Sequence, residues 1–191
     1  MSKNILFISD TIIKERSIVN TNTDPKLIYP DIKAAQDMYI LPVLGTALFN
    51  KIQTAVNAND WTGLTNYKTL LDDYIIDPLV YYVMAELPMN SYQFTNKGIM
   101  RKQGDNTELP SMADLISISN RYRDRAEHYT ERLRRYLLEK APTLFPEYLN
   151  PGNTIDTVLP KQSSFTMPVY LGDIKDPWCN PGGFTGKPYS E

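Results

Sequence analysis

A regular apolar stripe between residues 115 and 136 constrains the fold of this chain most strongly. Successive members lie three or four residues apart, which places them on one face of an α-helix: Leu115, Ile118, Tyr122, Ala126, Tyr129, Leu133 and Tyr136. Ser111 and Asp114 approximate a capping box at its start. We therefore predict a helix from residue 111 to about Lys140, roughly 45 Å long at about 1.5 Å per residue, with a partly polar groove at its tyrosines.

Shorter helices are predicted before this one. Asp24-Pro25 is typical of a helix start, because a carboxylate can cap the helix and proline is tolerated at its first position. Apolar residues then follow at helical spacing to Tyr39, and again from Leu44 to Val56. Pro42 disfavours helical geometry before it, so a break is expected there. A further helix over residues 70–87 contains Pro78 and is expected to kink.

The composition changes after Ala141. Eight of the fourteen prolines and five of the nine glycines fall in residues 142–191, so helix is improbable there. The runs 154–158 and 165–171 are compatible with two short strands forming a hairpin. Several aromatic residues argue against a purely solvated tail. We expect four of them to anchor the arm on another surface, either its own helical body or a neighbouring subunit: Phe165, Tyr170, Trp178 and Phe184.

The predicted fold class is therefore all-α. It is a small bundle of about four main helices with a long proline-rich extended C-terminal arm, which includes the short hairpin if the two strands form. The organisation is an irregular N-terminal segment (1–23), which carries one short helical turn over residues 11–16, a helical domain (24–149) and the arm (150–191).

Charge and composition restrict the function classes. The net charge of −2 gives no overall basic field to attract nucleic acid, although local basic clusters can still act. One cysteine, Cys179, and one histidine, His128, exclude an intrachain disulfide and any multi-histidine metal site. The apolar run near the N-terminus is too short for a secretory signal, and no run reaches membrane-span length. We expect a protein of a reducing cytoplasm.

Most sequence patterns typical of catalytic sites are not matched by this chain. PGGFTGKPYS resembles a phosphate-binding loop, but its glycines are wrongly spaced and Pro188 occupies the hydroxyl position. Asp72 and Asp73 are adjacent on a helix and point apart. Asp173 and Asp176 are interpreted as solvated carboxylates. We therefore expect no enzyme activity, no cofactor and no metal.

Two basic features remain. The first is the arginine-rich face of the last helix, with Arg121, Arg125, Arg132 and Arg135 as candidate contacts. Interspersed glutamates favour an ion-paired solvent face; contact with a protein partner and binding of nucleic acid are the alternatives. The second is the stretch TNKGIMRK between two helices, whose candidate contact residues are Thr95, Asn96, Lys97, Gly98, Arg101 and Lys102.

Four blocks of sequence together resemble a known family: PDIKAAQDMYILPVLGTALFNKI (30–52), YYVMAELPMNSYQFTNKGIMRK (81–102), YRDRAEHYTERLRRYL (122–137) and FPEYL (145–149). The chain resembles the small helical head–tail connector, or adaptor, proteins of tailed bacteriophages. It is most similar to those of crAss-like and related Bacteroides phages. The resemblance covers about residues 24–149 and does not extend into the arm.

The resemblance implies a structural virion protein without catalytic activity. Connectors of this type form a homo-oligomeric ring, commonly of twelve copies, beneath the portal protein. The ring extends the channel for packaged DNA, without sequence specificity, and docks the next neck or tail ring protein. It implies location in the virion neck after assembly in the host bacterial cytoplasm, with no membrane contact. The loop Thr95–Lys102 would enter a ring contact or face the channel, and the arm would hold a neighbouring protein. The alternative is a DNA-binding packaging or regulatory protein that uses the arginine-rich helix.

Overall fold

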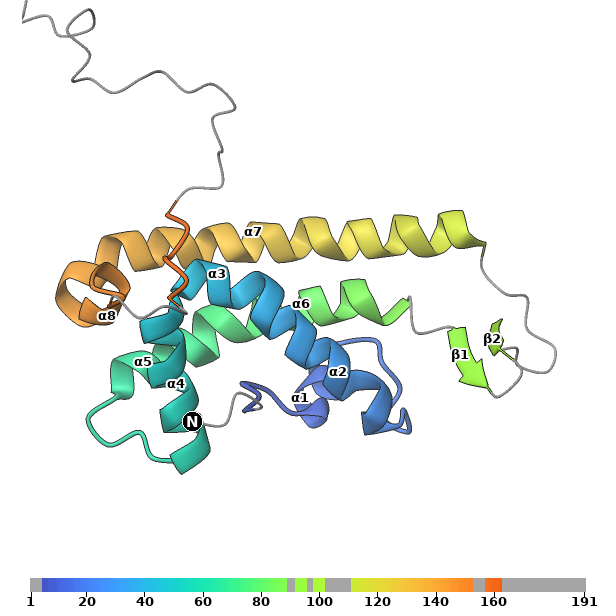
Figure 1. The fold of residues 1–191 in the computed structure, drawn as a ribbon, viewed down its shortest axis with the longest axis horizontal. Coiled ribbons are helices and arrows are strands. Elements are labelled where there is room, and N and C mark those ends of the chain that lie inside the picture. The colour runs from blue at the N-terminus through green and yellow to red at the C-terminus, as the bar shows by residue number, and fades with distance from the viewer. Residues whose placement is uncertain (1–4, 89–91, 96–97, 102–110, 153–156, 163–191) are drawn as a thin grey trace, which may run out of the picture.

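The computed structural model describes residues 5–88, 92–95, 98–101, 111–152 and 157–162. Most of these residues are helical (Figure 1). The elements, in chain order, are α1 (Asp10–Arg16), α2 (Pro25–Ala35), α3 (Leu41–Leu44), α4 (Thr46–Ala58), α5 (Thr65–Leu70), α6 (Ile76–Glu86), β1 (Tyr92–Thr95), β2 (Gly98–Arg101), α7 (Met112–Leu144) and α8 (Pro146–Leu149). The prediction of a mainly helical body is confirmed.

Both predicted helix starts are confirmed. The Asp24 carboxylate accepts the backbone N–H of Lys26 at 2.9 Å, and Pro25 is the first residue of α2. At the start of α7, the Ser111 hydroxyl accepts the Asp114 N–H at 3.2 Å, while the Asp114 carboxylate accepts the Ser111 N–H at 3.0 Å. This reciprocal pair satisfies two donors that a helix start leaves without partners.

The predicted disruptions at Pro42 and Pro78 take the form of π-helical turns. One turn spans Gln36–Ile40 and runs into α3, and the other spans Leu71–Ile75 and runs into α6. A proline ring collides with the carbonyl four residues earlier and donates no hydrogen bond. Those carbonyls belong to Met38 and Tyr74, which lie inside the two π turns. The widened turn makes room for the ring without ending the helix.

Helix α7 has 33 residues and spans the molecule, with α6 packed along it (Figure 1). It continues past the predicted end, through Pro142 to Leu144. The predicted apolar stripe is wrong at Ile118, which is 42% exposed, whereas neighbouring Ser119 is buried and donates its hydroxyl to the Ala85 carbonyl at 2.8 Å.

Small side chains of α7, including Ala126 and Thr130, lie in the middle of its contact with α6. Small residues at such a contact let two helices approach closely. The tyrosines lie at its edges: Tyr136 stacks on Tyr74 with ring centroids 4.0 Å apart, and Tyr129 stacks on Tyr81 at 5.3 Å. The predicted tyrosine groove is therefore a row of stacked rings beside the seam.

The described part of the N-terminal segment belongs to the same core. Phe7, Ile8 and Ile13 are buried, the last on α1, where a helical turn was predicted. Gln36 is completely buried and fastens the segment: its amide oxygen accepts the Phe7 N–H at 2.8 Å and its nitrogen donates to the Ile5 carbonyl at 3.0 Å.

An antiparallel hairpin joins β1 to β2, with Tyr92 opposite Arg101 and Thr95 opposite Gly98. It lies beyond the end of α6, at the end of the molecule where α7 begins (Figure 1). The sequence analysis predicted a different hairpin, from strands 154–158 and 165–171 of the arm; residues 154–156 and 163–171 of that prediction lie outside the described residues. Residues 96 and 97, between the two strands, lie outside the described residues.

Candidate functional site

The most specific feature of the structure is a break between two consecutive helices. Helix α3 ends and α4 begins at Gly45, whose backbone has φ 77° and ψ 158°. This region of backbone space is open almost only to glycine. A helix end leaves carbonyl groups without intrahelical partners, and a helix start leaves N–H groups without them. The break thus presents the Pro42 carbonyl and the Thr46 N–H side by side.

The root of the C-terminal arm, residues 157–162, satisfies both groups. The Thr46 N–H donates to the Val158 carbonyl at 3.0 Å, and the Lys161 N–H donates to the Pro42 carbonyl at 2.8 Å. The Thr46 hydroxyl accepts the Val158 N–H at 2.8 Å. A segment more than a hundred residues away in sequence therefore completes the hydrogen bonding of the break.

Arg134 adds a contact from α7. Its Nε–H donates to the Lys161 carbonyl at 3.1 Å, and its guanidinium forms an ion pair with Glu131. The side chain is only 10% exposed. A buried charge needs a partner of this kind, because desolvation without compensation is costly. We call Pro42, Gly45, Thr46 and Arg134 the arm seat.

Gly45 also sets how closely the arm root approaches. A Cβ atom at this position would lie 2.9 Å from Cδ of Pro160, and 3.3 Å from the Val158 carbonyl oxygen. Only a residue without a side chain leaves room for the proline ring. The same glycine therefore allows the helix break and the close approach of the arm.

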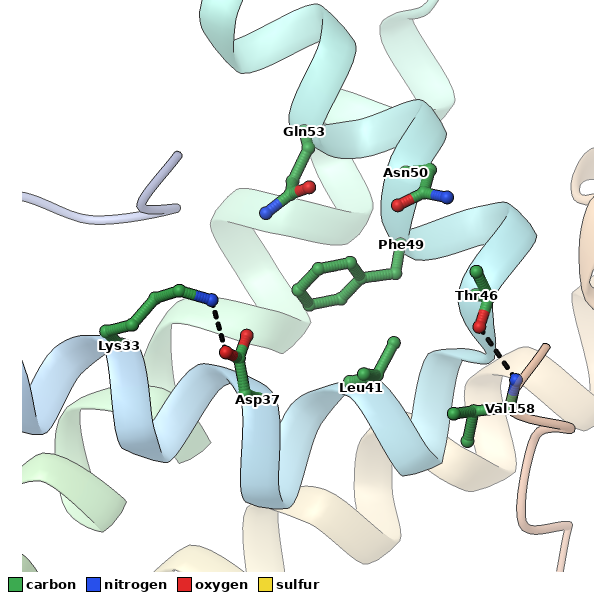
Figure 2. A pocket seen from close by; sticks show the side chains of 8 residues that line it. All are labelled: Lys33, Asp37, Leu41, Thr46, Phe49, Asn50, Gln53 and Val158. Carbon is green, nitrogen blue, oxygen red and sulfur yellow. Dashed lines mark hydrogen bonds and ion pairs between the residues drawn. The ribbon is translucent and has the colours of Figure 1, made fainter. Parts of the chain in front are cut away.

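A shallow pocket lies beside the arm seat (Figure 2). The Phe49 ring points into it from α4, Leu41 and Val158 supply further apolar surface, and the Lys33–Asp37 ion pair lies at its edge. Its volume is about 240 Å³, below the roughly 300–1,000 Å³ of small-molecule sites. The pocket is large enough for one side chain of a partner.

A second polar cluster ties α4, α5 and α8 together. Lys51 donates to the Tyr67 hydroxyl at 2.9 Å and pairs with Glu147, and Tyr67 donates to Glu147 at 2.7 Å. Burial raises the pKa of Glu147, but the hydrogen bonds from Lys51 and Tyr67 outweigh it and hold that pKa below its ordinary value. Burial likewise lowers the pKa of Lys51, while the bonds to Glu147 and Tyr67 raise it above the ordinary value overall.

The four predicted arginine contacts are all exposed on α7, in two pairs. Arg121 and Arg125 lie near its N-terminal half, and Arg132 and Arg135 lie a few turns further on. The Arg132 guanidinium lies 4.9 Å from the Tyr74 ring, Arg125 lies 5.7 Å from the Tyr122 ring, and Arg135 pairs with Glu131 at 3.6 Å.

Sequence reasoning missed Arg134. Its signal was its place on the apolar side of α7, one residue after buried Leu133.

The predicted basic loop coincides with the hairpin. Thr95 and Gly98 form the last pair of β1 and β2, and Arg101 ends the return strand opposite Tyr92. Asn96, Lys97 and Lys102 lie outside the described residues, as do the four predicted arm anchors, Phe165, Tyr170, Trp178 and Phe184.

Two negative findings apply to the described ranges. Among those residues, no group of three or more histidine, cysteine, aspartate or glutamate side chains is placed to hold a metal ion. No helix in the same ranges is long and apolar enough to cross a membrane. His128 is exposed on α7, with its ring edge toward Tyr129.

The fold and site define a helical protein in which a distant C-terminal segment is docked into a helix break. Residues 40–158 match the family of unknown function DUF6712, and the chain belongs to this family. The match includes the whole arm seat and ends at Val158, within the docked root. No curated protein and no solved structure matches the chain.

Proposed function

We propose that this protein is a structural subunit of the head–tail connector of a tailed bacteriophage. Copies of it would assemble in the host cytoplasm into a ring below the portal protein. The ring would dock the next neck or tail component and extend the DNA channel. The subunit would have no enzyme activity and no cofactor.

The observation that carries this proposal is the arm seat. Four hydrogen bonds fix the root of an aromatic, proline-rich segment to the helical body. Extended segments that make large contacts pay an ordering cost on association. A root that is already ordered reduces this cost and sets the place from which the segment starts. Such an arrangement suits a protein whose role is to hold other subunits.

The sequence resemblance to connector proteins gives the proposal its particular setting. The pocket beside the arm seat is small for a small-molecule site and fits one side chain of another subunit. The resemblance is tested directly on assembled particles.

DNA binding by α7 is the second candidate. Three of its arginines are engaged with glutamates: Arg123 with Glu86, and Arg134 and Arg135 with Glu131. Pairs of this kind reduce the positive charge available to phosphates. A DNA-binding protein would show affinity that falls steeply with salt, whereas the connector proposal expects no shift of DNA by the free subunit.

Native mass spectrometry of the purified protein and electron microscopy of virions test the connector proposal. We expect a closed ring in solution or on the portal, and density for this chain in the neck. Charge reversal at Lys97, Arg101 and Lys102 together should impair assembly or DNA retention and leave the monomer folded. A chain that stays monomeric with portal present and is absent from virions would refute the proposal.

A further inference from the structure

A groove opens on the face of the molecule where the segment after α1 meets α6 and α7. It consists of two adjoining hollows of about 170 and 240 Å³. Both are lined by Ile18, Tyr122 and Arg125. Val80 and Met84 belong to the first hollow, whereas Ile118 and Arg121 belong to the second, and we call the whole the Ile18 groove.

The groove combines exposed apolar surface with available positive charge. Ile18 is 84% exposed and Ile118 is 42% exposed. Arg16, at one edge, is already paired with Asp77 at 3.1 Å. Arg121 and Arg125, in contrast, have no carboxylate within ion-pair distance in the part of the chain that the structure describes. An occupant of this groove should therefore carry apolar side chains next to two carboxylates.

We propose that the Ile18 groove is the docking site for residues 172–178 of the same polypeptide, GDIKDPW. This stretch supplies the required chemistry: Asp173 and Asp176 flank Ile174, and Trp178 follows. Only one other acidic residue, Glu191, occurs after residue 162. The two aspartates pair with Arg121 and Arg125, while Ile174 and Trp178 cover the apolar surface. Tryptophan and arginine are both enriched among the residues that contribute most to protein contacts.

The length of the chain permits docking within one molecule. Arg134 holds the carbonyl of Lys161, and Arg121 lies thirteen residues earlier on the same helix, or roughly 20 Å at about 1.5 Å per residue. The eleven residues 162–172, between Lys161 and Asp173, can span up to roughly 36–40 Å at about 3.3–3.6 Å each. A short tether of this kind gives an effective concentration on the order of millimolar, so weak contacts suffice.

Fluorescence of Trp178 tests the proposal in the full-length chain. The chain has two tryptophans, Trp61 and Trp178, so Trp61→Phe leaves Trp178 as the only reporter. We expect blue-shifted emission and weak quenching by acrylamide. R121E/R125E should shift the emission to the red and raise the quenching constant several-fold. Adding D173R/D176R to that variant should restore the protected spectrum, because the opposite charges are exchanged.

R132E/R135E is the matched control, since it makes the same charge change on the same helix outside the groove. It should leave Trp178 protected. Equal effects of the two double variants on the emission of Trp178 would overturn the proposal. It would also be overturned if acrylamide quenched Trp178 in the Trp61→Phe chain as readily as a fully exposed tryptophan. Protection that is lost on dilution would also overturn it, because the occupant would then come from a second copy. The connector proposal is tested separately on rings and virions, so its failure can be told apart from a failure of this docking proposal.

Discussion

Replacement of Gly45 by alanine tests the arm seat most directly. The new Cβ would meet Cδ of Pro160 at 2.9 Å in a backbone conformation with φ 77° and ψ 158°. Backbone strain of this kind costs about 1–3 kcal/mol. Displacement of the proline also weakens the neighbouring hydrogen bonds at Thr46 and Lys161, at about 0.5–1.5 kcal/mol each. We expect the free energy of unfolding to fall by about 2–6 kcal/mol.

Gly63→Ala is the matched control. Gly63 has φ 72°, and nothing lies within 4 Å of a Cβ built there. Gly63→Ala therefore measures the stability lost when alanine takes a positive φ, without a collision like the one with Pro160. Chemical denaturation measures both variants, and hydrogen exchange reports whether the amides of Thr46, Val158 and Lys161 lose protection.

Gly45→Ala should be the less stable of the two and should lose protection at all three amides. If the two variants are equally stable and Val158 and Lys161 keep their protection, the arm root is not held in the way described. A loss of protection confined to Thr46 would also contradict the argument, because it would mean that the helix break is strained while the arm stays docked.

Three other variants test the remaining contacts. Arg134→Met keeps the side-chain length but removes the donor to the arm root, so it should cost about 1–3 kcal/mol and speed hydrogen exchange there, whereas exposed Arg132→Met should change stability by less than about 0.5 kcal/mol. The lowered pKa of Glu147 contributes stability above its unfolded pKa of about 4.3 that is lost as pH falls through the folded value. Glu147→Gln should therefore flatten the acidic limb of stability against pH, and an unchanged limb would refute this. Leu133→Ala should lower the free energy of unfolding by about 2–5 kcal/mol, because it opens a cavity in the core. Ile118→Ala, at a half-exposed position, should lower it by less than about 1 kcal/mol. Similar losses of stability for the two variants in thermal unfolding would contradict the observed seam.

Local rules predicted two helix starts and two interruptions correctly, but not the end of α7. The cap at Asp24, the capping box at Ser111 and the disruptions at Pro42 and Pro78 depend on residues within one or two turns of each other. The apolar seam of α7 was less predictable. Its periodicity gives the direction of the buried face, but the choice between Ile118 and Ser119 depends on how closely α6 approaches.

The arm seat was beyond sequence reasoning for a different reason. Its hydrogen bonds join Pro42 and Thr46 to Val158 and Lys161, and no local pattern links segments so far apart. The hairpin of β1 and β2 was not predicted either, because the stretch from Thr95 was interpreted as a turn joining two helices. In both cases the structure depends on pairing between segments, which helix periodicity does not report.

The helix break at LPVLGT explains why the root of the arm lies where it does. Gly45 interrupts what would otherwise be one helix, and the interruption exposes a carbonyl and an N–H that a continuous helix would satisfy internally. Such groups must find partners or stay in water, and residues 158–161 supply the partners. Because both ends of the break bind the same short segment, the root cannot shift along α4 without losing one of its two backbone contacts. The interruption of the helix thus sets the position, and not merely the presence, of the arm.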